Sequence, residues 1–500
     1  MGGGLIQLVA YGTQDLYLTH DPQITFFRMV YKRHTNFSCE LIPQYFNSVP
    51  NFNEKVTCTI SKSGDLIGKI YLYIKLPSVP KFFDFETGDI DDTKKFAWVK
   101  KVGYSIVKSI ELDIGGHIID KHYGDWLNIW NELSLRKNKR SIDEMIGDIP
   151  QLTNFTNGKD SYELMIPLEF WFCRNEGIAL PIIALQYSDV KVHIEFDKLE
   201  NICIFGPTNS IEIDEHIVHF KKYEYIEQTI LNKKNYGIFI NHDVINKRIE
   251  YIKINDNFLS KTSDTYVSNN TDYLIKGVNS KFSATPKLNS VESNININIL
   301  DLSISKSFLY INYIYLDNDE RLKFAKANHE YLIDCLQFDG DRNINNQSTK
   351  LNIGYSHPCK EIIWCSQLKY ISKKPFNNSF NYTNNVDKKK GESIIKKSRL
   401  LLNGIERTPR RNYSFYNYLQ PFQCHSNSPS EGISMYSFSL FPEIYQPSGT
   451  CNFSKIDDIV LEVTVDKEIN YSNPGIIKVF AVTKNVLRIL NGLAGLAFSN

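Results

Sequence analysis

The chain has 500 residues, 42% of them hydrophobic and 13% aromatic, which is enough for roughly two to four domains with their own cores. Its 57 basic and 56 acidic residues give a formal net charge of +1. A protein that coats nucleic acid directly carries a clear basic excess, so composition argues against genome packaging. No apolar run approaches the ~18 residues that a membrane-spanning helix needs.

The first stretch, residues 1–24, precedes any strand-like pattern and is expected to form an N-terminal arm. It has neither the charged start nor the apolar centre of a secretory signal. The opening MGGGLI resembles an N-myristoylation site, but Ile6 stands where that site needs Ser or Thr. We therefore expect an arm with neither a lipid nor a cleavable leader.

Short apolar alternations separated by turn residues predict antiparallel strands. Ile110–Ile114 alternates, Gly115 and Gly116 supply the positive φ of a two-residue turn, and His117–Lys121 returns as the second strand. Asp189–Asp197 alternates in the same way, with four apolar side chains on one face. This pattern is typical of β-sandwiches and jelly rolls.

Helices are expected at few places. Trp126, Ile129, Trp130 and Leu133 have helical spacing, with Asp125 placed as the cap of a helix that covers a sheet end. A capping-box pattern at 317–320 opens a second helix that is expected to run to about residue 333. We take 317–334 as a helical connector. It separates a first jelly roll at 25–316 from a second at 335–490, and 491–500 is left as a C-terminal tail.

The first roll is interrupted by an insertion at about 199–298, rich in Asn, Lys, Ile and Tyr. It is either a long decorated loop or a small extra domain between two strands. Residues 226–254 keep an apolar alternation and are expected to be ordered, whereas the polar stretches 263–270 and 281–294 are expected to be mobile. A shorter insertion, 374–397, interrupts the second roll.

Few residues carry metal-binding or catalytic patterns. His216 and His219 lie near acidic residues, but no cysteine or third histidine completes a metal site. His117 and His122 are expected on opposite faces of one strand, so a single metal cannot use both. No phosphate-binding loop, zinc-protease or nucleophile-elbow motif is present. We therefore expect no enzyme activity, no cofactor and no metal.

The basic run 388–411 lacks interleaved stacking aromatics and contains the apolar Leu400–Leu402. It is interpreted as a solvent-facing loop entering a strand, and no direct nucleic-acid partner is expected.

The nine cysteines include no CxxC pair. Cys359 and Cys365 would share one face if residues between them form a regular strand, but no second pair stands near them in the sequence. We therefore expect free thiols in a reducing compartment.

Nine Asn-x-Ser/Thr sequences occur, and those in the insertions would be the accessible glycan acceptors. These are Asn269, Asn377 and Asn381.

Several blocks resemble, in order, the major capsid proteins of the nucleocytoplasmic large DNA viruses. They are LIQLVAYGTQDLYLTHDPQITFFRMVYKRHTNF (5–37), IELDIGGHIIDKHYGDWLNIWNEL (110–133), MIPLEFWFCRNEGIALPIIALQY (165–187), YIYLDNDERLKFAKANHEYLID (313–334), HPCKEIIWCSQ (357–367), the run 400–457 and VLRILNGLAGLAFSN (486–500). Residues 199–298 and 369–393 lie outside the resemblance.

The resemblance implies an all-β protein of two consecutive eight-stranded jelly rolls with a few short helices and long loop insertions. It implies homotrimers that form pseudo-hexagonal capsomers and tile the outer shell of a large icosahedral virion, after assembly in the host cytoplasm. The implied partners are neighbouring capsomers and minor capsid and penton proteins. The arm is a candidate for reaching them, or an inner membrane layer.

Two other functions remain open at this point. The chain could be a minor or paralogous capsid protein at special positions. In a different class, it could be a carbohydrate-binding or glycosidase jelly-roll protein. A glycosidase needs two carboxylates roughly 5–10 Å apart in a cleft, whereas the acidic residues here mostly alternate outward on strands.

Overall fold

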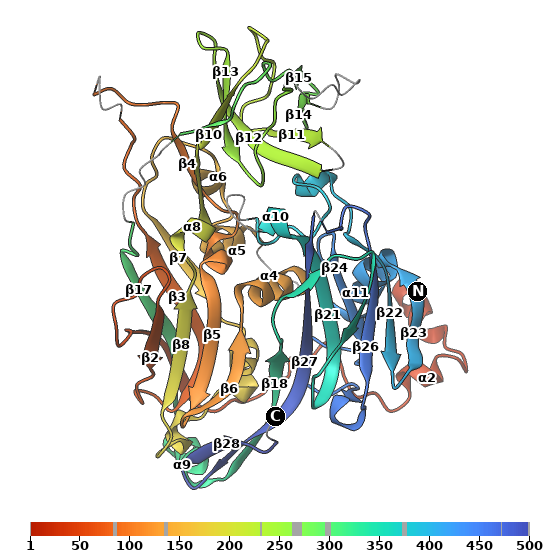
Figure 1. Cartoon of the computed structure of the whole chain (residues 1–500). Helices are drawn as coiled ribbons and strands as arrows, with labels where there is room; N and C mark the ends of the chain where they lie inside the picture. The colour runs from red at the N-terminus through yellow and green to blue at the C-terminus, as the bar shows by residue number, and fades with distance from the viewer. Residues whose placement is uncertain are drawn as a thin grey trace.

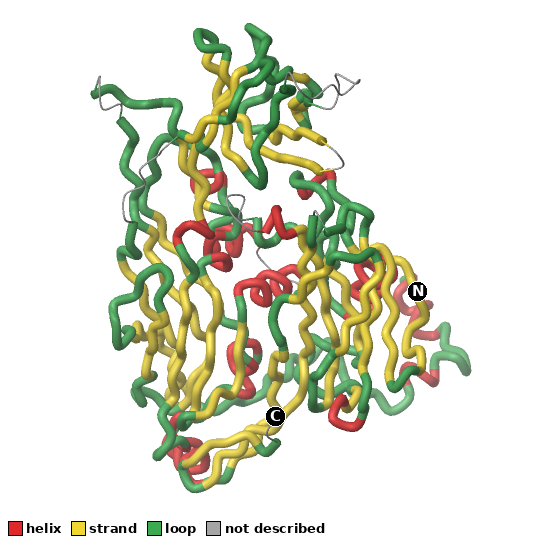
Figure 2. Tube along the Cα trace, in the orientation of Figure 1, coloured by secondary structure: helices red, strands yellow, loops and turns green. Residues whose placement is uncertain are grey.

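The computed structural model describes residues 2–83, 88–134, 139–230, 233–262, 273–295, 302–372, 378–471 and 473–498. The chain is built mainly of strands. They form two β-sandwiches that stand side by side, with a smaller β-domain above them (Figure 1). Helices are short; some lie between the sandwiches, as α4 does, and others lie beside the second sandwich near the N-terminus (Figure 2).

The first sandwich is an eight-stranded jelly roll made of two four-stranded antiparallel sheets. The first sheet has the order β1 (Phe37–Gln44), β17 (Lys306–Leu316), β3 (Leu66–Leu76) and β7 (Tyr162–Pro167). The second has the order β2 (Lys55–Thr59), β8 (Val190–Phe196), β5 (Val107–Ile114) and β6 (His117–His122). Because the insertion separates β8 from β17, the last strand of this roll lies far along the chain from its neighbours β1 and β3.

The alternations read from the sequence form strands of this roll. β8 buries every second side chain from Val190 to Phe196 and lies between β2 and β5. The hairpin of β5 and β6 turns at Gly115 and Gly116, whose φ values are +65° and +87°. Glycine has no Cβ and adopts these angles without steric cost, which fixes the register of the hairpin.

The second sandwich contains one seven-stranded and one four-stranded sheet. One has the order β18 (His329–Gln337), β27 (Gly475–Leu490), β21 (Pro358–Leu368) and β24 (Ile433–Ser437), and β19 (Arg342–Ile344), β25 (Cys451–Asn452) and β28 (Leu493–Leu496) add short pairings. The other has the order β20 (Ser348–Asn352), β26 (Ile459–Val465), β22 (Ile395–Leu402) and β23 (Ile405–Asn412). The all-β double jelly roll expected from the sequence is confirmed.

The insertion is a small extra domain and not a loop. Its sheet has the order β15 (Ser283–Ala284), β14 (Ile275–Gly277), β11 (Tyr225–Ile230), β12 (Lys233–Asp243), β13 (Arg248–Lys253), β10 (Asn209–Glu212) and β16 (Ser293–Asn294). It stands on a two-stranded stalk, β4 (Lys95–Trp98) and β9 (Cys203–Gly206). The chain enters and leaves side by side, since Ile295 N donates to Thr208 O at 2.7 Å. We call Asn209–Asn294 the insertion domain.

One expectation about the insertion domain is wrong. The polar stretch 281–294 is not a loop without structure: it supplies β15 and β16, and Ala284 is fully buried. Strands of two residues are too short to show a periodic pattern, so their pairing could not be read from sequence. The stretch 263–270 lies outside the described residues.

The helices are α1 (Gly3–Val9), α2 (Leu16–Thr19), α3 (Val102–Ser105), α4 (Gly124–Leu133), α5 (Lys139–Ile146), α6 (Pro150–Thr153), α7 (Trp171–Arg174), α8 (Leu199–Ile202), α9 (Asn318–Lys326), α10 (Lys369–Ser372) and α11 (Gln420–Cys424). α9 is the expected connector, but it ends at Lys326 and not near residue 333. β18 already begins at His329 and pairs with β27 over nine residues. The hydrogen bonds of this strand pairing outweigh the tendency of the local sequence to continue the helix. The second roll therefore begins earlier than 335.

Two further boundaries differ from expectation. The first strand begins at Phe37, so the segment without roll strands extends beyond residue 24 to residue 36. The C-terminal tail is not free, because β28 pairs with β27. The tight turn at Asn491 and Gly492, both with positive φ, folds the tail back in a hairpin.

Candidate assembly surfaces

Helix α4 fills the space between the two rolls (Figure 1). Its first residue is Gly124, a position with no room for a side chain: a Cβ there would lie 2.2 Å from Tyr104 O and 2.6 Å from Val107 O. From this close start the helix presents Trp126 and Trp130, both buried, to the second roll. They share an apolar cluster with Ile363, Met435 and Phe480. The helix thus joins the two rolls instead of covering the end of one sheet.

Asp125 does not cap this helix, as the sequence had suggested. The cap position is Tyr123, with no side-chain cap bond, because Asp125 lies one residue inside the helix. Its carboxylate instead receives a hydrogen bond from Lys478 of β27, at 2.6 Å between Nζ and Oδ2. An acidic residue in the first turn also favours the helix dipole. Asp125 therefore serves both the helix and the contact between the rolls.

A second ionic contact between the rolls is centred on Asp334 of β18. Lys360 of β21 and Lys484 of β27 each place Nζ 2.7 Å from its carboxylate, and Arg174 of α7 in the first roll lies 3.4 Å away. Burial alone would raise the pKa of Asp334, but the three cations outweigh it and lower the pKa. The Arg174 guanidinium also lies 4.7 Å from the Trp130 ring centroid, a cation–π contact.

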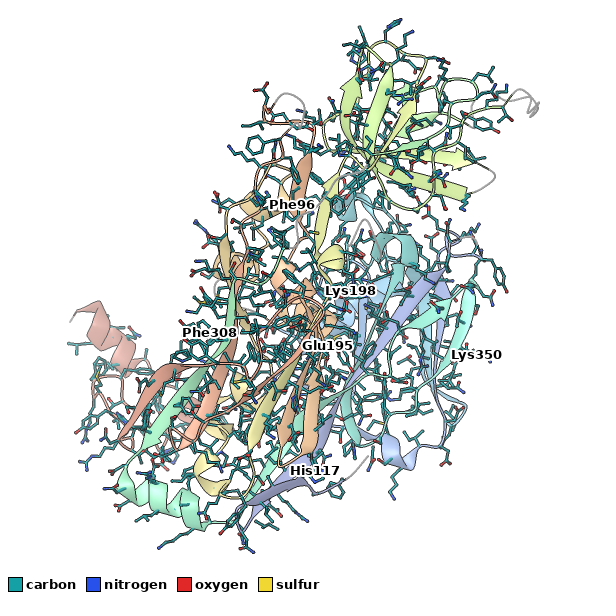
Figure 3. The ribbon with its side chains drawn as sticks, turned by 60° about the vertical axis from the view of Figure 1, so that its left-hand side comes forward. Phe96, His117, Glu195, Lys198, Phe308 and Lys350 are labelled. Carbon is teal, nitrogen blue, oxygen red and sulfur yellow. The ribbon has the colours of Figure 1, made fainter. Side chains whose placement is uncertain are left out.

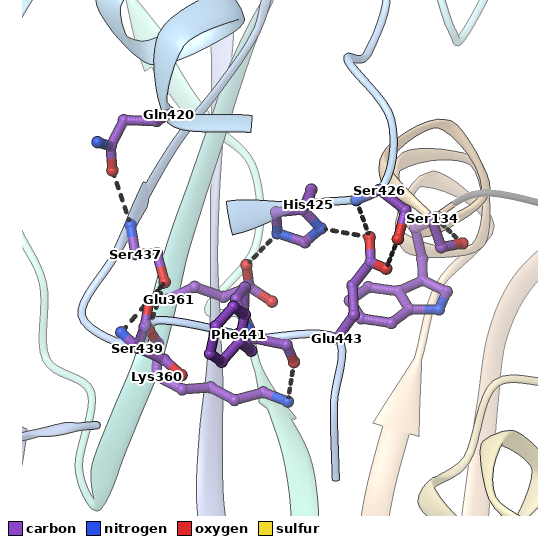
Figure 4. A network of polar contacts seen from close by, with 12 residues as sticks. Ser134, Lys360, Glu361, Gln420, His425, Ser426, Ser437, Ser439, Phe441 and Glu443 are labelled. Carbon is purple, nitrogen blue, oxygen red and sulfur yellow. Dashed lines mark hydrogen bonds and ion pairs between the residues drawn. The ribbon is translucent and has the colours of Figure 1, made fainter. Parts of the chain in front are cut away.

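Within the second roll, beside Trp130 of α4, His425 lies between two glutamates (Figure 4). His425 Nε2 lies 2.7 Å from Glu361 of β21, and Nδ1 lies 2.9 Å from Glu443. Burial disfavours the imidazolium, but the charges and hydrogen bonds of both carboxylates outweigh it and raise the pKa of His425 to about 9. The Trp130 ring lies against the same imidazole, with centroids 6.2 Å apart.

These contacts, which we call the seam, fix the two rolls relative to each other. The hairpin of β27 and β28 adds a further connection at the other end, where Tyr187 N donates to Gly492 O and Ala494 N donates to Ser188 Oγ. Several buried charged and aromatic groups come from each roll, so separation would leave charges unpaired as well as exposing apolar surface. The two rolls therefore form one body.

The N-terminal arm, unlike the buried seam, is almost entirely exposed. In residues 2–36 every side chain except Asp15 is exposed, including large apolar ones such as Tyr17, Phe27 and Met29, each more than 90% exposed. The arm projects at the left edge of the molecule in Figure 3. A contiguous apolar segment that its own chain does not cover marks a site of association.

The insertion domain touches the second roll as well as its own stalk. Tyr236, Ile238 and Ile252 belong to the same apolar cluster as the core of the second roll. Lys234 pairs with Glu468 at 2.7 Å. The domain therefore covers one end of the second roll.

The residues singled out in the sequence do not assemble into a chemical site. Among the residues that the structure describes, no group of three or more His, Cys, Asp or Glu could hold a metal ion. His219 packs against Phe282, and His122 stacks on Phe170 beside Asp120. No helix of the described part is long and apolar enough to cross a membrane.

The basic run 388–411 is largely neutralised by acidic neighbours. Lys388 lies 3.5 Å from Glu132 of α4, and Arg399 and Arg410 both contact Glu462. These residues thus serve contacts within the chain. The expected loop is short: residues 391–394 lead into β22, and most of the run lies in the paired strands β22 and β23.

Of the three glycan candidates, Asn381 was wrongly expected to be accessible. It is fully buried, and its amide donates to Asn385 O at 2.8 Å within the folded loop. Asn269 and Asn377 lie outside the described residues. The local turn that buries Asn381 is formed by neighbours such as Thr383 and Asn385, which a three-residue motif does not report.

Cys359 and Cys365 do not share a face. A β-bulge between Cys359 and Glu361 shifts the register, so Cys359 faces the core of the second roll and Cys365 faces the cluster around α4. The nine cysteines are free thiols in this structure.

Comparisons with known proteins agree over the whole chain. Residues 25–241 match the family described as major capsid protein N-terminus, and residues 320–495 match large eukaryotic DNA virus major capsid protein. "Probable capsid protein 4" of Acanthamoeba polyphaga mimivirus is 44% identical, and "Major capsid protein" of Pyramimonas orientalis virus is 34% identical; both alignments cover all of both chains. The solved Faustovirus major capsid protein shares the fold, with a TM-score of 0.66 at 13% identity over 96% of this chain and 94% of that one.

Proposed function

The chain belongs to the family of large eukaryotic DNA virus major capsid proteins, and on that basis we propose that it forms homotrimeric, pseudo-hexagonal capsomers. As a member of this family it is a structural protein of the capsid of a large icosahedral DNA virus, located in the shell of the virion. We propose that this structural role is its whole role and that it is not an enzyme.

The observation that best supports the proposed trimer is that the seam holds the two jelly rolls of one chain together. Two similar lobes in each chain give six lobes around a three-fold axis, and such a block tiles a hexagonal lattice. A closed three-fold ring leaves no matching interface free for a fourth chain. The rigidity of the seam supports the proposal, since lobes that moved independently would not keep a hexagonal outline.

The test is the mass of the full chain in solution. Light scattering at micromolar concentration should give three times the 57.8 kDa of one chain. A monomer mass that persists as the concentration is raised tenfold would overturn the trimer while leaving the family membership intact. Electron microscopy of the same sample should show particles with a six-lobed outline.

We propose that the N-terminal arm makes contacts outside the trimer. Its partners would be neighbouring capsomers, minor capsid and penton proteins, or an inner membrane layer. The support is its exposed apolar surface and its position outside both cores. No direct contact with nucleic acid is proposed, because the net charge is only +1.

We propose that the insertion domain forms the outer surface of the capsomer. It stands at one end of the rolls on a narrow stalk, and its strands form a sheet separate from those of both rolls. Labelling of surface lysines on intact particles tests this: Lys276 and Lys287 should be modified. If both are protected in particles but reactive in free trimers, the domain faces inward.

A second candidate function within the same class is a paralogous capsid protein at special positions of the shell. It is favoured by one observation: the relative with 44% identity is named probable capsid protein 4, whereas the relative named major capsid protein shares 34%. Quantifying the proteins of purified particles decides between them. The major protein would be the most abundant shell component, and a paralogue would be present in few copies.

A further inference from the structure

Two of the free cysteines face each other across neighbouring strands. Cys359 at the start of β21 is the register partner of Cys451 in β25. Residues directly opposite in an antiparallel ladder have Cα atoms roughly 4.5–5.5 Å apart, which falls within the 4.4–6.8 Å span of disulfides. Both side chains also pack against the core of the second roll, so they lie on the same face of the sheet.

The bulge in β21 creates this arrangement. Because the register shifts between Cys359 and Glu361, Cys359 turns into the core and toward β25. The two thiols are close enough for a charge on Cys451 to raise the pKa of Cys359, which burial already raises. Cys451 sits in a strand of only two residues, so few ladder hydrogen bonds hold it in place.

The segment that leads to Cys451 belongs to the seam. Pro442 O accepts a hydrogen bond from Lys360, Glu443 holds His425, and Tyr445 O accepts one from Lys484. After β25, Phe453 N donates to His357 O. A covalent bond at Cys451 would therefore fasten the end of a segment whose other residues hold Lys360, His425 and Lys484 of the seam.

We propose that Cys359 and Cys451 are a redox-controlled pair, reduced while the protein is made in the cell and joined as a disulfide once the particle is outside it. The timing rests on the virion location stated above, whereas the pairing rests on the fold alone. Intracellular thiols are kept reduced, and the extracellular medium is oxidising.

The oxidant is a small disulfide such as oxidised glutathione. The Cys451 thiolate attacks one of its sulfurs, forming a mixed disulfide and releasing one reduced thiol. The Cys359 thiolate then attacks the Cys451 sulfur, so the Cys359–Cys451 bond forms and the second reduced thiol leaves. Two protons and two electrons pass from the protein to the oxidant.

Cys451 is the first nucleophile because it is the more accessible of the two. Burial raises its pKa, and the nearby Arg407 guanidinium partly offsets this rise. Cys359 is fully buried, so it reacts only in the second step, with the Cys451 sulfur of the mixed disulfide.

The experiment uses the purified full chain in glutathione buffers of increasing oxidation. Free thiols are alkylated after unfolding, and the peptides are mapped by mass spectrometry. We expect linked peptides containing Cys359 and Cys451, with a mass lower by two hydrogens than the sum of the two free peptides. The exposed Cys39 serves as an internal check, because it should acquire glutathione whenever the oxidant is active.

The variants make the result specific. Cys451→Ser should abolish the linked peptides, and Cys424→Ser, which removes another partly buried thiol of the same roll, should leave them unchanged. The oxidised wild type should melt at a higher temperature than the reduced form, and this difference should vanish in Cys451→Ser. Because Cys359→Ala touches the core, it serves only as a second mapping control.

The proposal is overturned if Cys39 carries glutathione while Cys359 and Cys451 are both fully alkylated at the most oxidising ratio. It is also overturned if Cys451 stops at the mixed disulfide, because the two sulfurs then cannot meet. Neither result would bear on trimer formation, which is measured separately by mass.

Discussion

Lys478 of β27 donates to the carboxylate of Asp125 on α4, with 2.6 Å between Nζ and Oδ2, so each roll supplies one half of a largely buried ion pair. Burial alone would lower the pKa of Lys478, but Asp125 and Asp341 outweigh it and raise the pKa. The 353 residues between the partners show how far the seam reaches along the chain. The contribution of each seam residue to the free energy of unfolding can be measured by substituting that residue alone.

Asp334→Asn should destabilise the protein strongly. The change leaves Lys360, Lys484 and Arg174 around a neutral amide, and removing one partner of a buried ionic group costs about 3–5 kcal/mol. Chemical denaturation measures the free energy of unfolding. Glu330→Gln on the same strand is the matched control, because its partner Arg488 is about half exposed; that loss should stay below about 1 kcal/mol. Equal effects of the two changes would show that the seam carries little energy.

The stability contributed by His425 should depend on pH. Its pKa rises from an ordinary value near 6.5 to about 9 on folding, so its contribution is complete below pH about 6.5 and is lost as the pH rises through about 9. The difference in unfolding free energy between the wild type and His425→Gln should therefore shrink over that window, by on the order of 3 kcal/mol. Denaturation at a series of pH values measures it. A constant difference would mean that His425 is already neutral in the folded protein.

Gly124→Ala should be far more harmful than Gly116→Ala. At Gly124 the new methyl group would meet the backbone oxygens of Tyr104 and Val107, which cannot move without shifting β5. We expect a loss at or above about 3 kcal/mol. At Gly116 there is open space, so only the backbone strain of positive φ remains, about 1–2 kcal/mol. Thermal melting of the two variants side by side compares these costs. A mild Gly124→Ala would mean that α4 can slide along the seam.

Deleting residues 2–25 should leave the thermal stability and the trimer unchanged and impair assembly of the shell. The arm buries none of its side chains against its own chain, so the folded body loses no contact. Light scattering measures the trimer, and particle counts by electron microscopy measure assembly. Loss of soluble protein would show instead that the arm belongs to a core in the assembled state.

Replacing the insertion domain with a short Gly/Ser linker should preserve both rolls and the trimer but lower the melting temperature. Thr208 and Ile295 are hydrogen-bonded neighbours, so a short linker closes the gap at little entropic cost. The loss arises because the upper end of the second roll is uncovered, and increased binding of a hydrophobic dye should accompany it. Lys234→Ala, which removes only the ion pair with Glu468, should cause neither change. A linker variant that stays monomeric would place the insertion domain in the trimer interface.

Local patterns in the sequence were sufficient for the individual strands. The alternation of β8 and the two glycines between β5 and β6 determine a face and a turn by themselves, so they could be predicted. The sequence around β18 predicts helix, because Leu332 lies at helical spacing from residues of α9, whereas its strand partner β27 lies about 150 residues further on. Strand formation there depends on a neighbour that no local window contains.

The seam could not be found in the sequence for a related reason. Asp334, Lys360 and Lys484 carry no motif, and their meeting depends on the order of strands in a sheet. The same holds for His425: no local motif marks it, because its two glutamates lie 64 and 18 residues away along the chain. The bulge that separates Cys359 from Cys365 is likewise invisible in a regular alternation.

The last hairpin of the chain has a consequence for how a shell of such subunits bends. The two rolls are joined through α9 and again through β28, whose turn meets Tyr187 and Ser188 of the first roll. A body held at two separate points cannot hinge about either of them, so the angle between the lobes is set within a single chain. Curvature of the shell then has to be produced at the boundaries between subunits. Particle size is accordingly decided by the surfaces that meet there, and not by any flexing of the building block.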